Sequence, residues 1–100
     1  MGQLITIWWR DIPMQVIARE GRHTEKRVLD RRFQIAVDKA AMKSGKKSYG
    51  DYIEEMRRAE RPCSEDLEAE ANAEVARLDG AYTKEVLRGL VASGGEGERL

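Results

Sequence analysis

Apolar and polar residues alternate in two stretches near the start of the chain and predict two strands. Residues 3–9 carry apolar side chains on both faces, which is typical of a central strand covered on both sides. Residues 14–19 have one drier face. The four residues 10–13 suit a hairpin connection. Because proline cannot donate to a sheet ladder, Pro13 belongs in the turn or at the first position of the second strand.

A turn at residues 21–23 leads to a charged segment, residues 24–29, which the pattern predicts as a third strand. Charged side chains discourage an edge strand from pairing with other chains, so we place this segment at a sheet edge. The first third of the chain therefore predicts an antiparallel meander of two or three strands.

Helical spacing of the apolar residues begins after Asp30, whose carboxylate is a suitable N-cap. We expect this helix to run to about Ser44 and to end at Gly45. Ser48 is then expected to cap a second helix, which Pro62 closes.

One long apolar stripe follows, and it is formed by Leu67, Ala71, Val75, Leu78, Tyr82, Val86 and Leu90. We expect Ser64 to cap this helical segment, and Gly80 and Thr83 to kink it or to split it in two. Residues 65–74 are rich in carboxylates and predict a solvated helix face. Residues 94–100 are glycine-rich and predict a flexible tail.

Strands followed by helices predict the α+β class, with a small antiparallel β-meander followed by three or four packed helices. The length of 100 residues predicts one domain, over residues 1–93, with the tail over residues 94–100. No apolar run approaches the roughly 20 residues of a membrane span, and the start does not read as a signal peptide. We therefore expect a cytoplasmic protein.

Cys63 and His23 are the only cysteine and the only histidine in the sequence. Zinc sites usually need three or four ligands, so we expect no metal site and no cofactor. The sequence has no phosphate-binding glycine motif and no nucleophile elbow, and no carboxylate spacing selects an acid–base pair. The sequence therefore indicates no catalytic residue and favours a non-enzymatic role.

The net charge is zero but unevenly spread, because residues 1–61 carry an excess of five positive charges and residues 62–100 an excess of five negative ones. The two halves could attract each other within one fold or in a head-to-tail pair of chains. A candidate anion-binding patch comprises Arg22, Lys26, Arg27, Arg31 and Arg32. The alternative for this patch is a solubilising edge.

The densest group of large and charged residues comprises Trp8, Trp9, Arg10, Asp11 and Pro13. Neighbouring strand residues point to opposite sides, so the two indoles cannot share one core unless the strand bulges. If helices cover one face only, one tryptophan is partly exposed, and exposed Trp beside Arg is typical of protein interfaces. The alternative is that both rings are core residues and that Arg10 and Asp11 order the turn.

The string W-R-D-I-P at residues 9–13, followed by Gln15-Val16-Ile17, resembles the opening of a small bacterial family labelled "virulence factor", which is abundant in alphaproteobacteria. The similarity continues through residues 32–42 and into residues 76–82, so it covers most of the chain. The label defines no activity. The resemblance implies an accessory role, because members tend to be encoded near genes of folate-linked and corrinoid one-carbon metabolism.

The favoured function is a cytoplasmic accessory or adaptor protein that binds a protein partner, such as a one-carbon-metabolism enzyme, through the Trp8–Pro13 hairpin. One alternative is a small-molecule or nucleotide-binding protein that stacks its ligand on the indoles and holds anionic groups with the Arg22–Arg32 patch. A second alternative is nucleic-acid binding, which the zero net charge disfavours.

Overall fold

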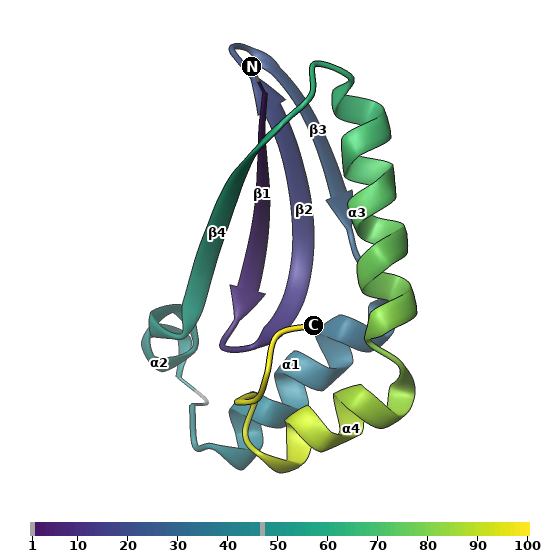
Figure 1. The fold of residues 1–100 in the computed structure, drawn as a ribbon. Coiled ribbons are helices and arrows are strands. Elements are labelled where there is room, and N and C mark those ends of the chain that lie inside the picture. The colour runs from purple at the N-terminus through teal and green to yellow at the C-terminus, as the bar shows by residue number, and fades with distance from the viewer. Residues whose placement is uncertain (1, 47) are drawn as a thin grey trace.

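The structure is a computed structural model that describes residues 2–46 and 48–100. Within these residues it has a four-stranded antiparallel sheet and four helices (Figure 1). The elements, in chain order, are β1 (Gly2–Trp9), β2 (Ile12–Glu20), β3 (His23–Val28), α1 (Arg31–Lys43), α2 (Tyr49–Glu54), β4 (Met56–Cys63), α3 (Leu67–Ala81) and α4 (Lys84–Ala92). The α+β class is confirmed, but the sheet has four strands rather than two or three.

Strand β4 is the element that the sequence pattern did not predict. Ser48 caps α2 as expected, accepting a hydrogen bond from the backbone of Asp51, but the helix ends at Glu54. The expected continuation of this helix to Pro62 is wrong, because the chain instead pairs antiparallel with β1 and gives the strand order β3-β2-β1-β4. An edge strand tolerates Pro62 because its nitrogen can face away from the ladder.

Helix α1 begins and ends where the sequence predicts. The Asp30 carboxylate accepts a hydrogen bond from the backbone nitrogen of Arg32, as an N-cap does. Past the other end of the helix, Gly45 has a φ of 76°, a left-handed conformation that glycine adopts without steric cost.

The long apolar stripe is split into α3 and α4, which is one of the two expected outcomes. Thr83 caps α4 by accepting from the backbone of Val86, whereas Asp66, not Ser64, caps α3. The carboxylate-rich start of α3 is not uniformly solvated, because Glu74 is buried and pairs with Arg77 at 2.8 Å. No helix in the described part of the chain is long and apolar enough to cross a membrane.

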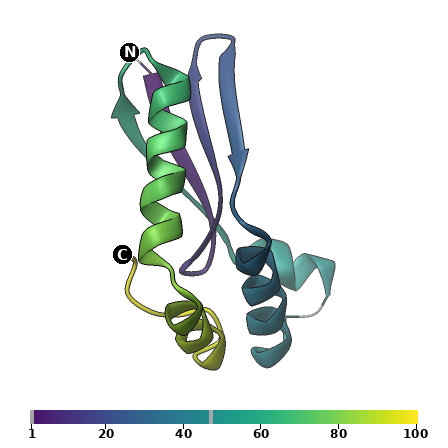
Figure 2. The ribbon, with the colours of Figure 1, turned by 90° about the vertical axis from the view of Figure 1, so that its right-hand side faces the viewer.

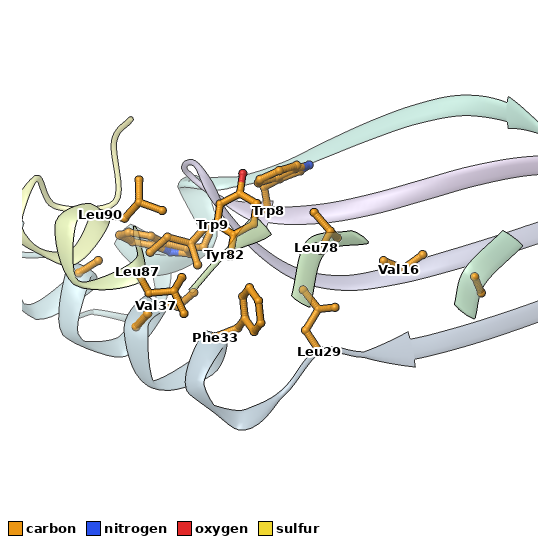
Figure 3. Close-up of a cluster of buried hydrophobic side chains, with 14 of the residues drawn as sticks. Trp8, Trp9, Val16, Leu29, Phe33, Val37, Leu78, Tyr82, Leu87 and Leu90 are labelled. Atoms are coloured by element: carbon orange, nitrogen blue, oxygen red, sulfur yellow. The ribbon is translucent and has the colours of Figure 1, made fainter. Parts of the chain in front are cut away.

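The helices cover the sheet in two places (Figure 2). Helix α3 lies along one face of the sheet, over β2 and β3, while α1 and α4 pack together beyond the β1–β2 turn. One cluster of buried side chains joins both regions, and Figure 3 shows part of it around Tyr82 and Phe33. The β1–β2 hairpin therefore reaches from the sheet towards the helices, with buried tryptophans at its end and a partly buried turn at Arg10 and Asp11.

Candidate functional site

The β1–β2 turn is held by two distant segments of the chain. Arg10 has a φ of 52°, in the left-handed region that residues with side chains rarely adopt. Its backbone nitrogen donates to the carbonyl oxygen of Glu55 at 2.9 Å. The backbone nitrogen of Asp11 donates to the carbonyl oxygen of Gly95 at 2.8 Å. The turn is thus fixed by the start of β4 on one side and by the C-terminal segment on the other.

A β-bulge lies just before this turn. Ile7 pairs with Gln15, but the next residue, Trp8, pairs with Pro13, which leaves Met14 as the extra residue on β2. A bulge bends its strand and increases the local twist. The two tryptophans therefore occupy a twisted end of the hairpin rather than a flat sheet.

Both tryptophans are buried (Figure 3). Trp8 is 5% exposed and packs edge-on against Tyr82, with ring centroids 6.1 Å apart. Trp9 is fully buried, lies 5.8 Å from the ring of Tyr52 and donates from Nε1 to the carbonyl oxygen of Tyr52 at 2.9 Å. The expectation of a partly exposed indole is therefore wrong, because the helices and the C-terminal segment cover the hairpin on both sides.

The two indoles differ in one respect. The Nε1 atom of Trp8 is buried and finds no acceptor among the described residues. A buried donor without a partner costs about 1–3 kcal/mol. The guanidinium of Arg99 lies 4.4 Å from the centroid of the Trp8 ring, a cation–π contact that leaves this N–H without an acceptor among the described residues.

Residues 94–100, expected to form a flexible tail, instead lie against the hairpin. We call residues 94–100 the C-terminal strap. Arg10 donates from Nη1 to the carbonyl oxygen of Gly94 at 2.9 Å, and its guanidinium also lies 5.3 Å from the centroid of the Trp9 ring. Gly94 and Gly95 are buried. The strap therefore closes the core over Trp9.

The far end of the strap is held by the Asp11 carboxylate. Asp11 accepts from the backbone nitrogen of Gly97 at 2.9 Å and from Nε of Arg99 at 3.0 Å. Arg99 also donates to the carbonyl oxygen of Arg10 at 3.0 Å. Leu100 donates from its backbone nitrogen to the Tyr82 hydroxyl at 2.8 Å. The charged residues of the predicted site thus bind a segment of the same chain.

Glu55 is the acidic centre of this cluster. Its carboxylate accepts from Arg10 at 3.0 Å, and Arg57 and Lys46 approach it at 3.5 and 3.7 Å. The hydrogen bond from Arg10 is the main reason why the pKa of Glu55 lies below its usual value. The cluster lines a small polar cleft of about 140 Å³, in which three basic and three acidic side chains balance each other. Such a balance does not select a charged ligand.

The predicted anion-binding patch does not converge. Arg22 lies in the β2–β3 turn, whereas Arg31 and Arg32 follow the other end of β3, about 20 Å away at 3.3 Å per strand residue. Arg27 is engaged by Glu25 at 3.1 Å. Lys26 is exposed on β3. Arg22 at one end of β3 therefore does not share a patch with Arg31 and Arg32 at the other end.

A second basic surface, which the sequence did not predict, lies in a groove of about 300 Å³ between α1 and α4. Its apolar lining is formed by Ile35, Ala36, Leu87 and Val91, and its basic lining by Arg32, Lys39, Lys84 and Arg88. No acidic side chain of the described chain lines it. The sequence signal that could have pointed to this groove is Ile35, an apolar residue of α1 that is 41% exposed and lies off the buried face of that helix. We call this surface the α1–α4 groove.

The remaining candidate chemistry is dispersed. His23 starts β3 and Cys63 ends β4, so three strand spacings, about 14 Å, separate them across the sheet. Burial raises the pKa of the Cys63 thiol, which disfavours the reactive thiolate. Among residues 2–46 and 48–100, no group of three or more His, Cys, Asp or Glu side chains is arranged to hold a metal ion.

Comparison with known proteins assigns the chain to a family. No curated protein and no solved structure matches it. A family model described as "Virulence factor" matches residues 7–91, which include the whole hairpin turn, both lining helices of the α1–α4 groove up to Val91, and the strand β4. This match covers most of the 100 residues, so the chain belongs to the virulence factor family.

Proposed function

We propose that the protein is a non-enzymatic accessory or adaptor module that binds a protein partner through the α1–α4 groove. The observation that carries the proposal is an open apolar lining flanked by basic side chains, with no acidic side chain of the described chain lining it. The partner that fits this chemistry is an amphipathic helix with acidic flanks. The groove replaces the hairpin as the docking surface, because both hairpin indoles are buried.

The apolar lining gives such a helix a surface to bury. Ile35 is 41% exposed and Val91 is partly exposed, and both line the groove, one from each of its two helices. A helix laid between α1 and α4 could cover them with residues spaced i, i+3, i+4 and i+7. Each Å² of apolar surface removed from water contributes about 25 cal/mol.

The basic side chains give the groove its preference for an acidic partner. Arg32 is already paired with Asp79 at 2.9 Å and with Asp30 at 3.3 Å. Lys39 and Arg88 form no ion pair or hydrogen bond with another residue in the described part of the chain. The charge of Lys84 already acts on Asp30 and helps to lower the pKa of that carboxyl. Lys39 and Arg88 are therefore the groove cations available to the carboxylates of a partner, and they lie on the two different helices that flank the groove.

A partner from one-carbon metabolism remains part of this proposal. The resemblance that links the family to folate-linked and corrinoid enzymes suggests the class of partner, and the groove suggests how its helix would be bound. A mainly apolar contact with a few charged pairs is typical of helix-in-groove recognition.

The test uses a synthetic helix of about 18 residues, or five turns, with leucine at the i, i+3, i+4 and i+7 positions and glutamate on the flanks. We expect the double variant Lys39→Glu/Arg88→Glu to bind this peptide about tenfold more weakly than the unmodified chain in fluorescence anisotropy. The matched control is Lys26→Glu, which reverses an exposed lysine on β3, away from the groove. We expect this control to leave the affinity unchanged.

Equal affinities for the double variant and the unmodified chain would show that the groove does not bind the helix. A thermal shift of the unmodified chain with folates, corrinoids or nucleotides, abolished by the same double variant, would instead replace the protein partner with a small anionic ligand.

A further inference from the structure

We propose that the β1–β2 turn is a binding site for an extended peptide of the pattern Gly-Gly-x-Gly-x-Arg, and that the C-terminal strap occupies this site as a ligand within the same chain. The partner would be a protein that carries the same pattern and displaces the strap. This site is separate from the α1–α4 groove and does not depend on the function proposed for it.

The strap contacts the turn as a bound peptide would. The carbonyl oxygens of Gly94 and Gly95 accept from Arg10 and Asp11, and the backbone nitrogen of Gly97 donates to the Asp11 carboxylate. Three of the polar contacts thus use the backbone of the strap rather than its side chains. Backbone contacts give affinity to an extended ligand, and specificity comes from the pockets for individual residues.

The first pocket accepts only glycine. Gly95 has a φ of 93°, and a Cβ atom at this position would lie 2.8 Å from Cζ3 of Trp9. The indole of Trp9 is fully buried and cannot move aside easily. The ring of Trp9 therefore restricts the second position of the pattern to glycine.

The second pocket accepts arginine. The guanidinium of Arg99 lies 4.4 Å from the centroid of the Trp8 ring, and it donates to the Asp11 carboxylate and to the carbonyl oxygen of Arg10. An aromatic face, a carboxylate and a carbonyl oxygen together match a planar cation with several donors. Lysine lacks the planar set of donors that reaches the Asp11 carboxylate and the Arg10 carbonyl oxygen together, so the pocket selects arginine.

The site lies within the residues matched by the family model, whereas the strap that occupies it lies beyond them. The family match includes Trp8, Trp9, Arg10 and Asp11, and it ends at residue 91, before the strap begins. The strap follows α4 directly, so its local concentration at the turn is high, on the order of millimolar for a short tether. A peptide in solution therefore competes poorly until the strap is weakened.

The experiment weakens the strap in the 100-residue chain and then supplies it as a peptide. The variant is Gly95→Ala, and the matched control is Gly89→Ala in α4, where a Cβ atom meets no heavy atom within 4 Å. The probe is a synthetic peptide with the sequence of residues 92–100, which contains no aromatic residue. The two tryptophans both lie in the site, so intrinsic fluorescence reports on binding directly.

We expect Gly95→Ala to shift tryptophan emission to longer wavelength, and the peptide to reverse this shift. The unmodified chain and Gly89→Ala should bind the peptide at least about tenfold more weakly than Gly95→Ala, because their own strap competes. A peptide that carries alanine in place of Gly95 or Arg99 should not reverse the shift.

If Gly95→Ala does not fold, Arg99→Ala serves as the weakened variant, since it removes strap contacts but leaves the groups of the turn intact. Folding is checked by circular dichroism. A folded variant that shows no peptide binding would overturn the proposal and leave the strap as a purely structural closure of the core. Loss of binding in the added variant Asp11→Asn would support it.

Discussion

Trp8 and Trp9 are neighbours in the chain, but their polar atoms are in opposite situations. Trp9 donates its indole proton to the carbonyl oxygen of Tyr52, which fixes α2 against the hairpin. The indole nitrogen of Trp8 finds no acceptor in the described part of the chain. The two rings are similar in size and burial, so the difference in hydrogen bonding should decide how each tolerates replacement.

We expect Trp9→Phe to destabilise the protein by about 1–3 kcal/mol more than Trp8→Phe. The reason is that Trp9→Phe removes the hydrogen bond from the indole and leaves the carbonyl oxygen of Tyr52 without its donor. Trp8→Phe removes a donor that has no acceptor, so its loss of packing is partly offset. Urea denaturation followed by far-UV circular dichroism measures both variants, and each serves as the control for the other. A larger loss in Trp8→Phe would mean that packing against Tyr82 outweighs the hydrogen-bonding difference.

At the scale of elements, strand β4 shows where the sequence pattern misleads. Tyr49, Tyr52 and Met56 recur at helical spacing, and Glu54 precedes Arg58 by four residues, so the segment satisfies a helical pattern. An edge strand that α3 does not cover needs little apolar alternation, and β4 accordingly exposes six of its eight residues. Its reason to be a strand is the open ladder of β1, a partner more than forty residues away.

Elements with local signals were predictable, and elements defined by distant partners were not. The hairpin, α1 and the division between α3 and α4 follow from alternation, caps and glycine, all of which act within a few residues. The site shows the same limit. The residues of the turn could be chosen from composition, but their partners Glu55 and the C-terminal strap could not, since neither is near them in the chain.

The ladder between β1 and β4 predicts which positions of β4 tolerate proline. Arg10 donates its backbone hydrogen bond to Glu55, and Pro62, which has no N–H, faces Gln3. Both observations give the same alternation, in which Ala59 bonds to β1 and Glu60 points its N–H outward. The two residues are neighbours on one exposed strand, so they form a matched pair.

We therefore expect Ala59→Pro to be about 1–3 kcal/mol less stable than Glu60→Pro, because only the first removes a ladder hydrogen bond. Thermal and urea unfolding of both variants provides the comparison. Equal losses would mean that β4 does not pair with β1 in this register.

At the scale of the whole molecule, the uneven charge of the sequence is used within the fold. Arg32 of α1 pairs with Asp79 of α3 at 2.9 Å, and Arg61 of β4 approaches Glu74 of α3 at 3.8 Å. Each pair joins the basic part of the chain to the acidic part. These contacts are partly exposed, so each contributes little by itself, but they favour the packing of α3 beside the strands.

Tyr82 connects the two regions of the core. It is fully buried between α3 and α4, and its ring lies 6.1 Å from that of Trp8 and 6.2 Å from that of Phe33 in α1. Its hydroxyl accepts from Leu100 at the end of the strap. One residue therefore contacts the hairpin, the helical end and the C-terminal strap. The two regions of the core cannot separate without exposing the Tyr82 ring.

This arrangement predicts one cooperative unfolding transition. Tryptophan fluorescence reports on the turn and far-UV circular dichroism on all the helices, so we expect the two urea midpoints to coincide. A fluorescence transition at lower urea concentration would show that the hairpin end opens before the rest of the fold.

Tyr82→Ala should lower both urea midpoints together, because the cavity that it leaves borders both regions of the core. A replacement of this size in a core costs about 3–5 kcal/mol. Separation of the two midpoints in this variant would contradict the expected joint loss, and would mean that the hairpin end and the helices unfold independently without the Tyr82 ring.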